Sequence, residues 1–170
     1  MTATNNALFP TLARYNQWAN RLLYAACGAL TEAEFVVQRP AFFGSILGTL
    51  NHVLVGDRVW LARIEGSTHD ITALDQILYD TRLALTGARE AEDLRIIAIA
   101  DAQTPAKLAE TLKYTNFAGD VLKTPVDLVF THLFNHQTHH RGQVHGLLSA
   151  TNVPPPPLDL IFYLREIGHS

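Results

Sequence analysis

The sequence predicts an all-α protein, an up-and-down bundle of helices joined mostly by short connections. Apolar residues recur at three- and four-residue spacings in several long segments, which is the period of an amphipathic helix. Proline and glycine interrupt the chain between those segments. No change of composition marks a domain boundary within the 170 residues, so we expect one domain over residues 1–170.

The first half of the chain contains two long predicted helices. Residues 11–30 form the first, with Gly28 near its end as a stop signal. Thr31 and Glu34 then make the capping-box pattern that begins a short helix. After a break at Pro40 and Gly44, the second long helix runs from about residue 45 to residue 64.

The second half adds two further long helices and a short one. Residues 74–100 carry apolar and charged stripes that predict a long solvent-facing helix. Residues 104–125 are ambiguous between a two-stranded excursion around residues 116–119 and a loop. A fourth long helix opens near Pro125 and continues to about residue 150. Four prolines at 154–157 force an extended linker, and residues 158–168 close the chain as a short helix.

Composition excludes several classes of function. The formal net charge is -3, and Lys and Arg are scattered singly, which argues against a nucleic-acid partner. No apolar run approaches the roughly 18 residues of a membrane span, and residues 1–10 lack the features of a signal peptide. We therefore expect a cytoplasmic protein without a membrane partner. The single Cys27 lies among apolar residues, as a small buried hydrophobe does.

Five of the eight histidines lie within one stretch, "FTHLFNHQTHHRGQVHG", residues 130–146. On a helical wheel only His136 and His140 face the apolar side, and they are four residues apart, a spacing that lets two imidazoles hold one ion. His132 lies at the margin of that side, His139 lies outside it, and His145 points away among polar residues.

The second long helix contains a histidine that could join those of the fourth helix, and an aspartate on its apolar face. His52 lies on the rim of the apolar arc of that helix, and Asp57 lies in its middle, where an unpaired carboxylate is costly. The preferred interpretation of Asp57 is a buried ion pair with an arginine such as Arg14, Arg21 or Arg63. The alternative is an acceptor that fixes a ligand imidazole. Spacing alone leaves open whether these histidines bind metal or are hydrogen-bonded core residues.

Four segments resemble the DinB/YfiT-like family of metalloenzymes, and together they span nearly the whole chain. They are "YNQWAN", "LNHVLVGDRVWLARI", "HLFNHQTHHRGQVHGLL" and "DLIFYLREI", and "NHxxHHRGQ" at residues 135–143 is the most specific pattern. The resemblance implies a four-helix bundle with one further C-terminal helix, often a homodimer. It also implies a divalent metal, nickel or zinc, held by three histidines, which in this chain are His52, His136 and His140.

The resemblance also suggests a chemistry. Characterised relatives include isomerases that use mycothiol on maleylpyruvate and transferases that use bacillithiol. We therefore expect a metal-dependent enzyme with S-transferase-like chemistry, a low-molecular-weight thiol as cosubstrate and a small electrophilic substrate. Gln143 lies on the ligand side of its helix and is a candidate to hydrogen-bond near the metal, whereas Arg141 is expected to make a structural pair. Residues 71–124 are expected to shape the substrate pocket.

Two alternatives belong to other classes of protein. The first is a metal-dependent hydrolase in which a bound hydroxide attacks the substrate, with Asp57 as the general-base candidate. The second is a non-catalytic metal-binding protein of the stress response, in which the metal holds the bundle together or the histidines sense pH.

Overall fold

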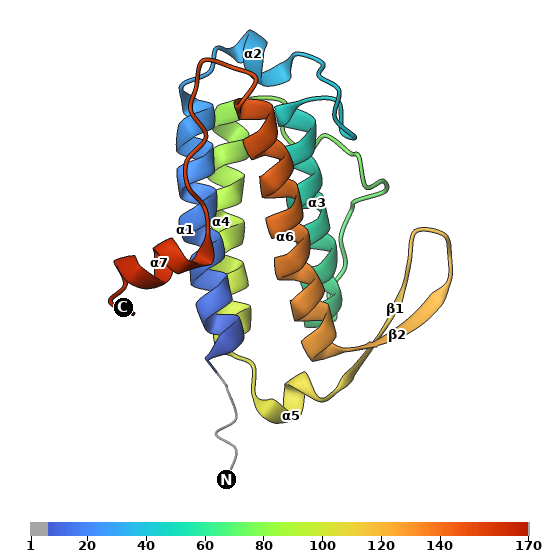
Figure 1. Cartoon of the computed structure of the whole chain (residues 1–170). Coiled ribbons are helices and arrows are strands. Elements are labelled where there is room, and N and C mark those ends of the chain that lie inside the picture. The colour runs from blue at the N-terminus through green and yellow to red at the C-terminus, as the bar shows by residue number, and fades with distance from the viewer. Residues whose placement is uncertain (1–6, 170) are drawn as a thin grey trace.

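Four long helices form an up-and-down bundle in the computed structural model, which describes residues 7–169 (Figure 1). They are α1 (Leu8–Gly28), α3 (Ile46–Glu65), α4 (Arg82–Asp101) and α6 (Val126–Leu148). Helix α1 packs against α4 and α6, and α3 packs against α6 and α4. The predicted all-α bundle is confirmed, and so is the additional short C-terminal helix, α7 (Leu160–Glu166).

Side-chain caps explain where several helices begin. Ser45 accepts a hydrogen bond from the amide of Gly48 at the start of α3, and Gly66 ends that helix in the left-handed region at a φ of 67°. Thr31 and Glu34 form the expected capping box of the short α2 (Glu32–Val36). The two ends of α3 are therefore fixed locally, and this helix carries one of the candidate site histidines.

The prediction of a helix over residues 74–100 is wrong at its N-terminal end, because α4 begins only at Arg82. The segment just before α4 is irregular and is held by the side-chain amide of Asn51 in α3. The Oδ1 of Asn51 accepts hydrogen bonds from the backbone N–H groups of Leu78 and Tyr79. Its Nδ2 also donates to the carbonyl of Tyr79. These bonds replace helical ones, and Thr81 then caps α4.

A β-hairpin resolves the ambiguous region between α4 and α6. After a single helical turn, α5 (Pro105–Leu108), strands β1 (Thr111–Thr115) and β2 (Val121–Pro125) pair antiparallel. Their turn closes through a hydrogen bond from the amide of Asn116 to the carbonyl of Asp120, with Gly119 at a positive φ of 91°. The hairpin projects from the bundle beside the lower ends of α3 and α6 (Figure 1).

The interior of the bundle is apolar at both ends and polar in the middle. One apolar cluster includes Leu23, Leu54 and Leu148, and a second includes Leu61, Phe130 and Leu133. Between them lies a buried polar network with members from all four long helices: Asn16, Asn20, Asp57, Arg89, Asp93, Gln137 and Arg141. The two arginines balance the two aspartates, so the network buries no net charge.

Asp57 belongs to this network. It is fully buried, and its Oδ2 accepts from the guanidinium of Arg89 and from the side-chain amide of Gln137. The interpretation as a buried ion pair therefore describes its contacts, but the partner is Arg89 in α4 and none of the three arginines named from the sequence. The sequence pattern could not single out Arg89, because it left the orientation of the helix that carries this residue undefined.

Candidate metal centre

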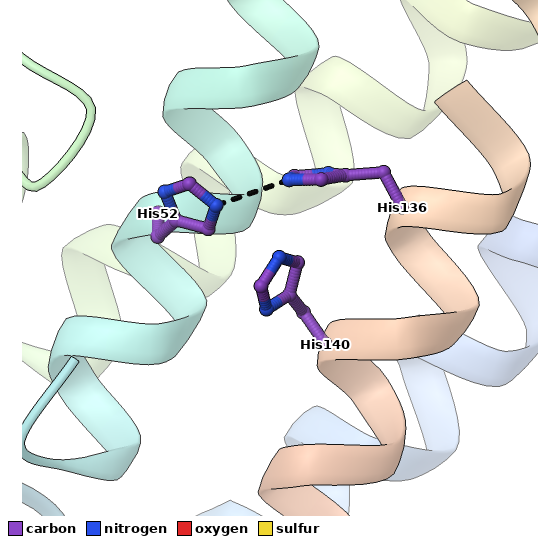
Figure 2. A group of neighbouring side chains, drawn as sticks. All are labelled: His52, His136 and His140. Carbon is purple, nitrogen blue, oxygen red and sulfur yellow. Dashed lines mark hydrogen bonds between the residues drawn. The ribbon is translucent and has the colours of Figure 1, made fainter. Parts of the chain in front are cut away.

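Three histidines from two neighbouring helices converge beside the polar network. His52 extends from α3, and His136 and His140 extend from successive turns of α6 toward it (Figure 2). One ring nitrogen from each lies within 4.8 Å of the other two. The Nε2 atoms of His52 and His136 are 3.0 Å apart. The i, i+4 spacing on α6 places its two imidazoles one above the other, and α3 supplies the third.

Hydrogen bonds on the outer side of two rings set their tautomers. The Nδ1–H of His52 donates to the backbone carbonyl of Leu74 at 2.7 Å. The Nδ1–H of His140 donates to Oε1 of Gln143 at 2.8 Å. Because a carbonyl or amide oxygen can only accept, both Nδ1 atoms carry the proton when the ring is neutral. Both Nε2 lone pairs are then free to face the other histidines, as in a metal site whose ligands are oriented by outer hydrogen bonds.

The surroundings favour neutral imidazoles, the form that binds metal. Burial, followed by the neighbouring His140 and His52, lowers the pKa of His136 to about 3. Burial also lowers the pKa of His52 and that of His140. The Nδ1 of His136 is buried without a hydrogen-bond partner. A cationic ring would therefore be disfavoured here, and three neutral donors would be available at ordinary pH.

Two neighbours without polar side chains hold the rings in place. The ring of Phe43 stacks on His52, with centroids 3.8 Å apart and an interplanar angle of 18°, and meets His140 edge-on at 5.6 Å. Gly56, one turn after His52 on α3, leaves the space that the His136 ring fills. A Cβ placed at Gly56 would lie 2.7 Å from the Cε1 of His136.

The remaining histidines of the stretch lie outside the cluster. His132 is exposed and meets the ring of Trp60 edge-on at 5.1 Å. His139 is exposed, and its Nε2 lies 3.2 Å from the side-chain nitrogen of Gln143. His145 takes no part in the cluster or in the pocket described below.

The other residues named from the sequence differ in whether they contact the histidine cluster. Gln143 contacts a histidine of the cluster directly, whereas Asp57 contacts Arg89 and Gln137 and no imidazole. Arg141 is buried and donates to Asn16, Asn20 and Gln137 of the polar network. Cys27 is buried, and its burial raises the pKa of the thiol to about 12, which makes it a poor nucleophile.

Sequence reasoning missed Leu74 and Phe43. The contribution of Leu74 is a backbone carbonyl, for which no side-chain pattern exists, in a segment expected to be helical. Phe43 lies in the break between two predicted helices. The one signal in the sequence was the position of this aromatic residue shortly before the helix that carries His52.

A pocket of about 900 Å³ opens onto the cluster. Helices α3 and α6 form its floor, the hairpin forms one wall, and Phe42, Phe43, Leu74 and Asp75 contribute from the connecting segments. The lining combines aromatic and aliphatic side chains with five histidines, and its charged residues are Arg63 and Asp75. Asp57 does not line this pocket.

The donor set fits a divalent transition metal or zinc. Imidazole nitrogens bind such ions at about 2.0–2.1 Å, which places neighbouring ligand nitrogens roughly 3–3.4 Å apart. The pair formed by His52 and His136 already has that separation. Closing the full triad requires movements on the order of 1 Å, within the range of small side-chain rotations. Three ligands that face an open pocket leave a coordination position accessible.

These features define a helical-bundle protein with a three-histidine cluster that can hold a metal ion, and no helix in residues 7–169 has the length and apolarity needed to cross a membrane. The chain matches the DinB family over residues 1–168, and it belongs to that family. It is similar to Protein DinB of Bacillus subtilis (strain 168), with 28% identity over 161 residues that cover 90% of this chain and 91% of that protein. The resemblance found in the sequence motifs is thereby confirmed.

Proposed function

We propose that the protein binds a divalent metal ion, nickel or zinc, through His52, His136 and His140. The convergence of three neutral imidazoles at the base of an open pocket is the observation that supports this proposal. Softer sulfur ligands are absent from the cluster, and imidazole suits both metals. The carbonyl of Leu74 and the amide of Gln143 would hold two of the ligands in their binding tautomers.

We further propose that the protein is an enzyme with S-transferase-like chemistry, which joins a low-molecular-weight thiol to a small electrophile. When bound, the metal would favour the thiolate over the thiol, as metal coordination generally does. The thiol releases its proton to solvent through the open mouth of the pocket. Its sulfur forms a bond to the electrophilic carbon, and the leaving group departs with the electron pair of the broken bond.

The contacts of Asp57 favour this proposal over a hydrolase. A general base must reach the water that it activates. Asp57 is enclosed by Arg89 and Gln137 outside the pocket, so it is not available for that role. The non-catalytic alternative is disfavoured by the accessible coordination position, since a structural site is closed by its own ligands.

Metal analysis of histidine variants tests the site. We expect untagged protein to contain close to one equivalent of nickel or zinc, and His52→Ala, His136→Ala and His140→Ala to lose most of it. His145→Ala, on the same helix but outside the cluster and the pocket, is the matched control and should retain its metal. Far-UV circular dichroism should show the same helix content in all four variants. Full metal occupancy in the three site variants would refute the ligand assignment.

The catalytic part of the proposal has a separate test. Metal-loaded protein should consume a small electrophile such as a haloalkane or an epoxide only in the presence of a thiol such as bacillithiol or mycothiol. The reaction should disappear in His52→Ala and continue in His145→Ala, which lies outside the pocket. Consumption that proceeds equally without thiol would support the hydrolase instead.

The resemblance leads us to propose a homodimer as well. Sedimentation equilibrium of the full chain should give twice the chain mass of 18.8 kDa. A single 18.8 kDa species at micromolar concentration would contradict this part of the proposal.

A further inference from the structure

The pocket that contains the histidine cluster has a second polar end. Arg63 lies in the last turn of α3, on the side of the pocket formed by the β-hairpin. Its guanidinium carbon lies 4.7 Å from the ring centroid of Trp60 and 4.6 Å from that of Tyr114 in β1. The two rings meet edge-on with centroids 5.1 Å apart. Contacts with two aromatic rings hold the guanidinium in one place, as cation–π contacts do.

Arg63 lacks the carboxylate that other arginines of this chain possess. Five arginines form ion pairs within residues 7–169: Arg14, Arg58, Arg82, Arg89 and Arg95. Arg63 forms none, and its hydrogen bond within that part of the chain goes to the backbone carbonyl of Thr115 at 3.0 Å. Burial lowers the pKa of Arg63, and no carboxylate in that part of the chain opposes that effect. The guanidinium remains charged and retains unused N–H donors.

The spacing along α3 sets the distance between the two ends. His52, Gly56, Trp60 and Arg63 follow one another along one face of the helix and line the same pocket. Eleven residues advance by roughly 16 Å along a helix axis, and side chains lean toward the N-terminus. The centre of the histidine cluster and the guanidinium are therefore separated by roughly 10–15 Å. Trp60 and His132, in edge-on contact, lie between them.

We propose that Arg63 binds a carboxylate or a similar anionic group at the far end of an elongated ligand whose other end reaches the histidine cluster. This inference deepens the proposed function and depends on it for the metal-bound end. It names the class of ligand: a small molecule with a metal-binding atom, an apolar middle and a terminal anion. A guanidinium flanked by aromatic rings at one end of the pocket is well placed to recognise a carboxylate, because its planar N–H groups match the two oxygens.

Asp75 makes the pocket directional. It follows Leu74, whose carbonyl accepts the Nδ1–H of His52, and it lines the pocket, so its charge lies at the histidine end. In the metal-free pocket an anion is therefore repelled near Asp75 and attracted near Arg63. A ligand with one anionic end should enter with that end toward the hairpin, leaving its other end beside the histidines.

A matched pair of thiols with the sulfur on the terminal carbon tests the proposal on nickel-loaded protein. Mercaptooctanoate has a chain long enough to span the two ends, and mercaptooctanol has the same length without the charge. Calorimetry should show the acid binding about 10- to 100-fold more tightly than the alcohol, the usual range for a hydrogen bond to a charged group. Arg63→Gln should reduce this preference to less than about 3-fold.

Two controls make the result specific. Arg21→Gln removes the same charge from an exposed position outside the pocket and should keep the preference of the wild type. The short acid mercaptopropionate should bind equally to the wild type and Arg63→Gln, because its carboxylate cannot reach. A preference for the long acid that survives in Arg63→Gln, or that disappears in Arg21→Gln, would overturn the assignment.

A metal-free arm separates this inference from the proposed function. Octanoate and octanol are added to metal-free protein, and binding is followed by the NMR signals of the Arg63 Nε–H and the Trp60 indole. Octanoate should shift both signals in the wild type and leave the indole unperturbed in Arg63→Gln. If the thiol adds no affinity, so that mercaptooctanoate binds the nickel-loaded protein no more tightly than octanoate, while octanoate behaves as expected, the proposed function fails and the Arg63 site stands. If both thiols bind equally and octanoate leaves both signals unchanged, the Arg63 site fails and thiol binding at the metal stands.

Discussion

Gly56 shows how one absent methyl group can shape the candidate site. The residue lies in the middle of α3, where glycine is unfavourable for a helix by about 0.5–1 kcal/mol relative to alanine. The ring of His136 occupies the space where a Cβ would be. The glycine therefore lowers the stability of α3 but lets the imidazole of His136 approach from α6.

Replacing Gly56 tests this relation. In Gly56→Ala the new methyl group should displace the His136 ring, which can rotate, so the fold survives while the affinity for nickel falls by about 10-fold or more, as with other misplaced ligands. Gly142→Ala is the matched control, because nothing lies within 4 Å of a Cβ there. That variant should bind metal normally and unfold at an equal or higher temperature. Unchanged nickel affinity in Gly56→Ala would show that His136 is not held by this contact.

Gln143 acts on the site through His140. Its Oε1 accepts the Nδ1–H of that ring, which leaves Nε2 unprotonated toward the cluster. In Gln143→Met the acceptor is lost, and we expect nickel affinity to fall by about 10-fold, with competition titration as the measurement. Asn135→Ala, an exposed change on the same helix, should leave the affinity unaltered. An equal loss in both variants would indicate a general effect on α6.

At the scale of the helices, the buried polar network fixes how the four long elements face one another. Arg89 in α4 reaches Asp57 in α3 and Asp93 one turn further along its own helix. Arg141 in α6 reaches Asn16 in α1. A purely apolar interior would tolerate rotations of these helices, whereas the ion pairs and hydrogen bonds of the network form in one arrangement. That arrangement presents His52 and His136 to each other.

Removing the arginine at the centre of the network should be costly. Arg89→Met leaves Asp57 and Asp93 buried without their main cationic partner, and we expect unfolding free energy in urea to fall by about 3–5 kcal/mol. Arg14→Ala breaks the exposed pair with Asp101 and should cost less than about 1 kcal/mol. Comparable losses in the two variants would mean that burial does not govern the strength of these pairs.

At the scale of the helices, some features could be predicted from the sequence and others could not. Periodicity located the four long helices, because each buries an apolar face, and it placed His136 and His140 on the inward side of their helix and His52 on the rim of its apolar arc. It failed for residues 74–81, where the side chain of Asn51 replaces helical hydrogen bonds from a distance. It also failed to pair Asp57 with Arg89. Both failures concern contacts between elements, for which a local pattern has no information.

For the whole molecule, the position of the histidine cluster predicts how metal affects stability. The cluster joins α3 to α6, which already pack against each other through apolar residues on both sides of the polar network. The metal-free protein should therefore be folded, and metal should add stability by mass action. At a free metal concentration of 100 times Kd, binding adds about 2.7 kcal/mol.

That increment is measurable as a thermal shift. For a chain of this size each kcal/mol raises Tm by about 2–4 °C, so saturating nickel should raise Tm by about 5–10 °C. His52→Ala should show no shift and should melt near the temperature of the metal-free wild type, since its core clusters are unchanged. A metal-free protein without cooperative melting would instead mean that the ion is needed to assemble the bundle. The site would then be structural in origin, and the accessible pocket beside it would need another explanation.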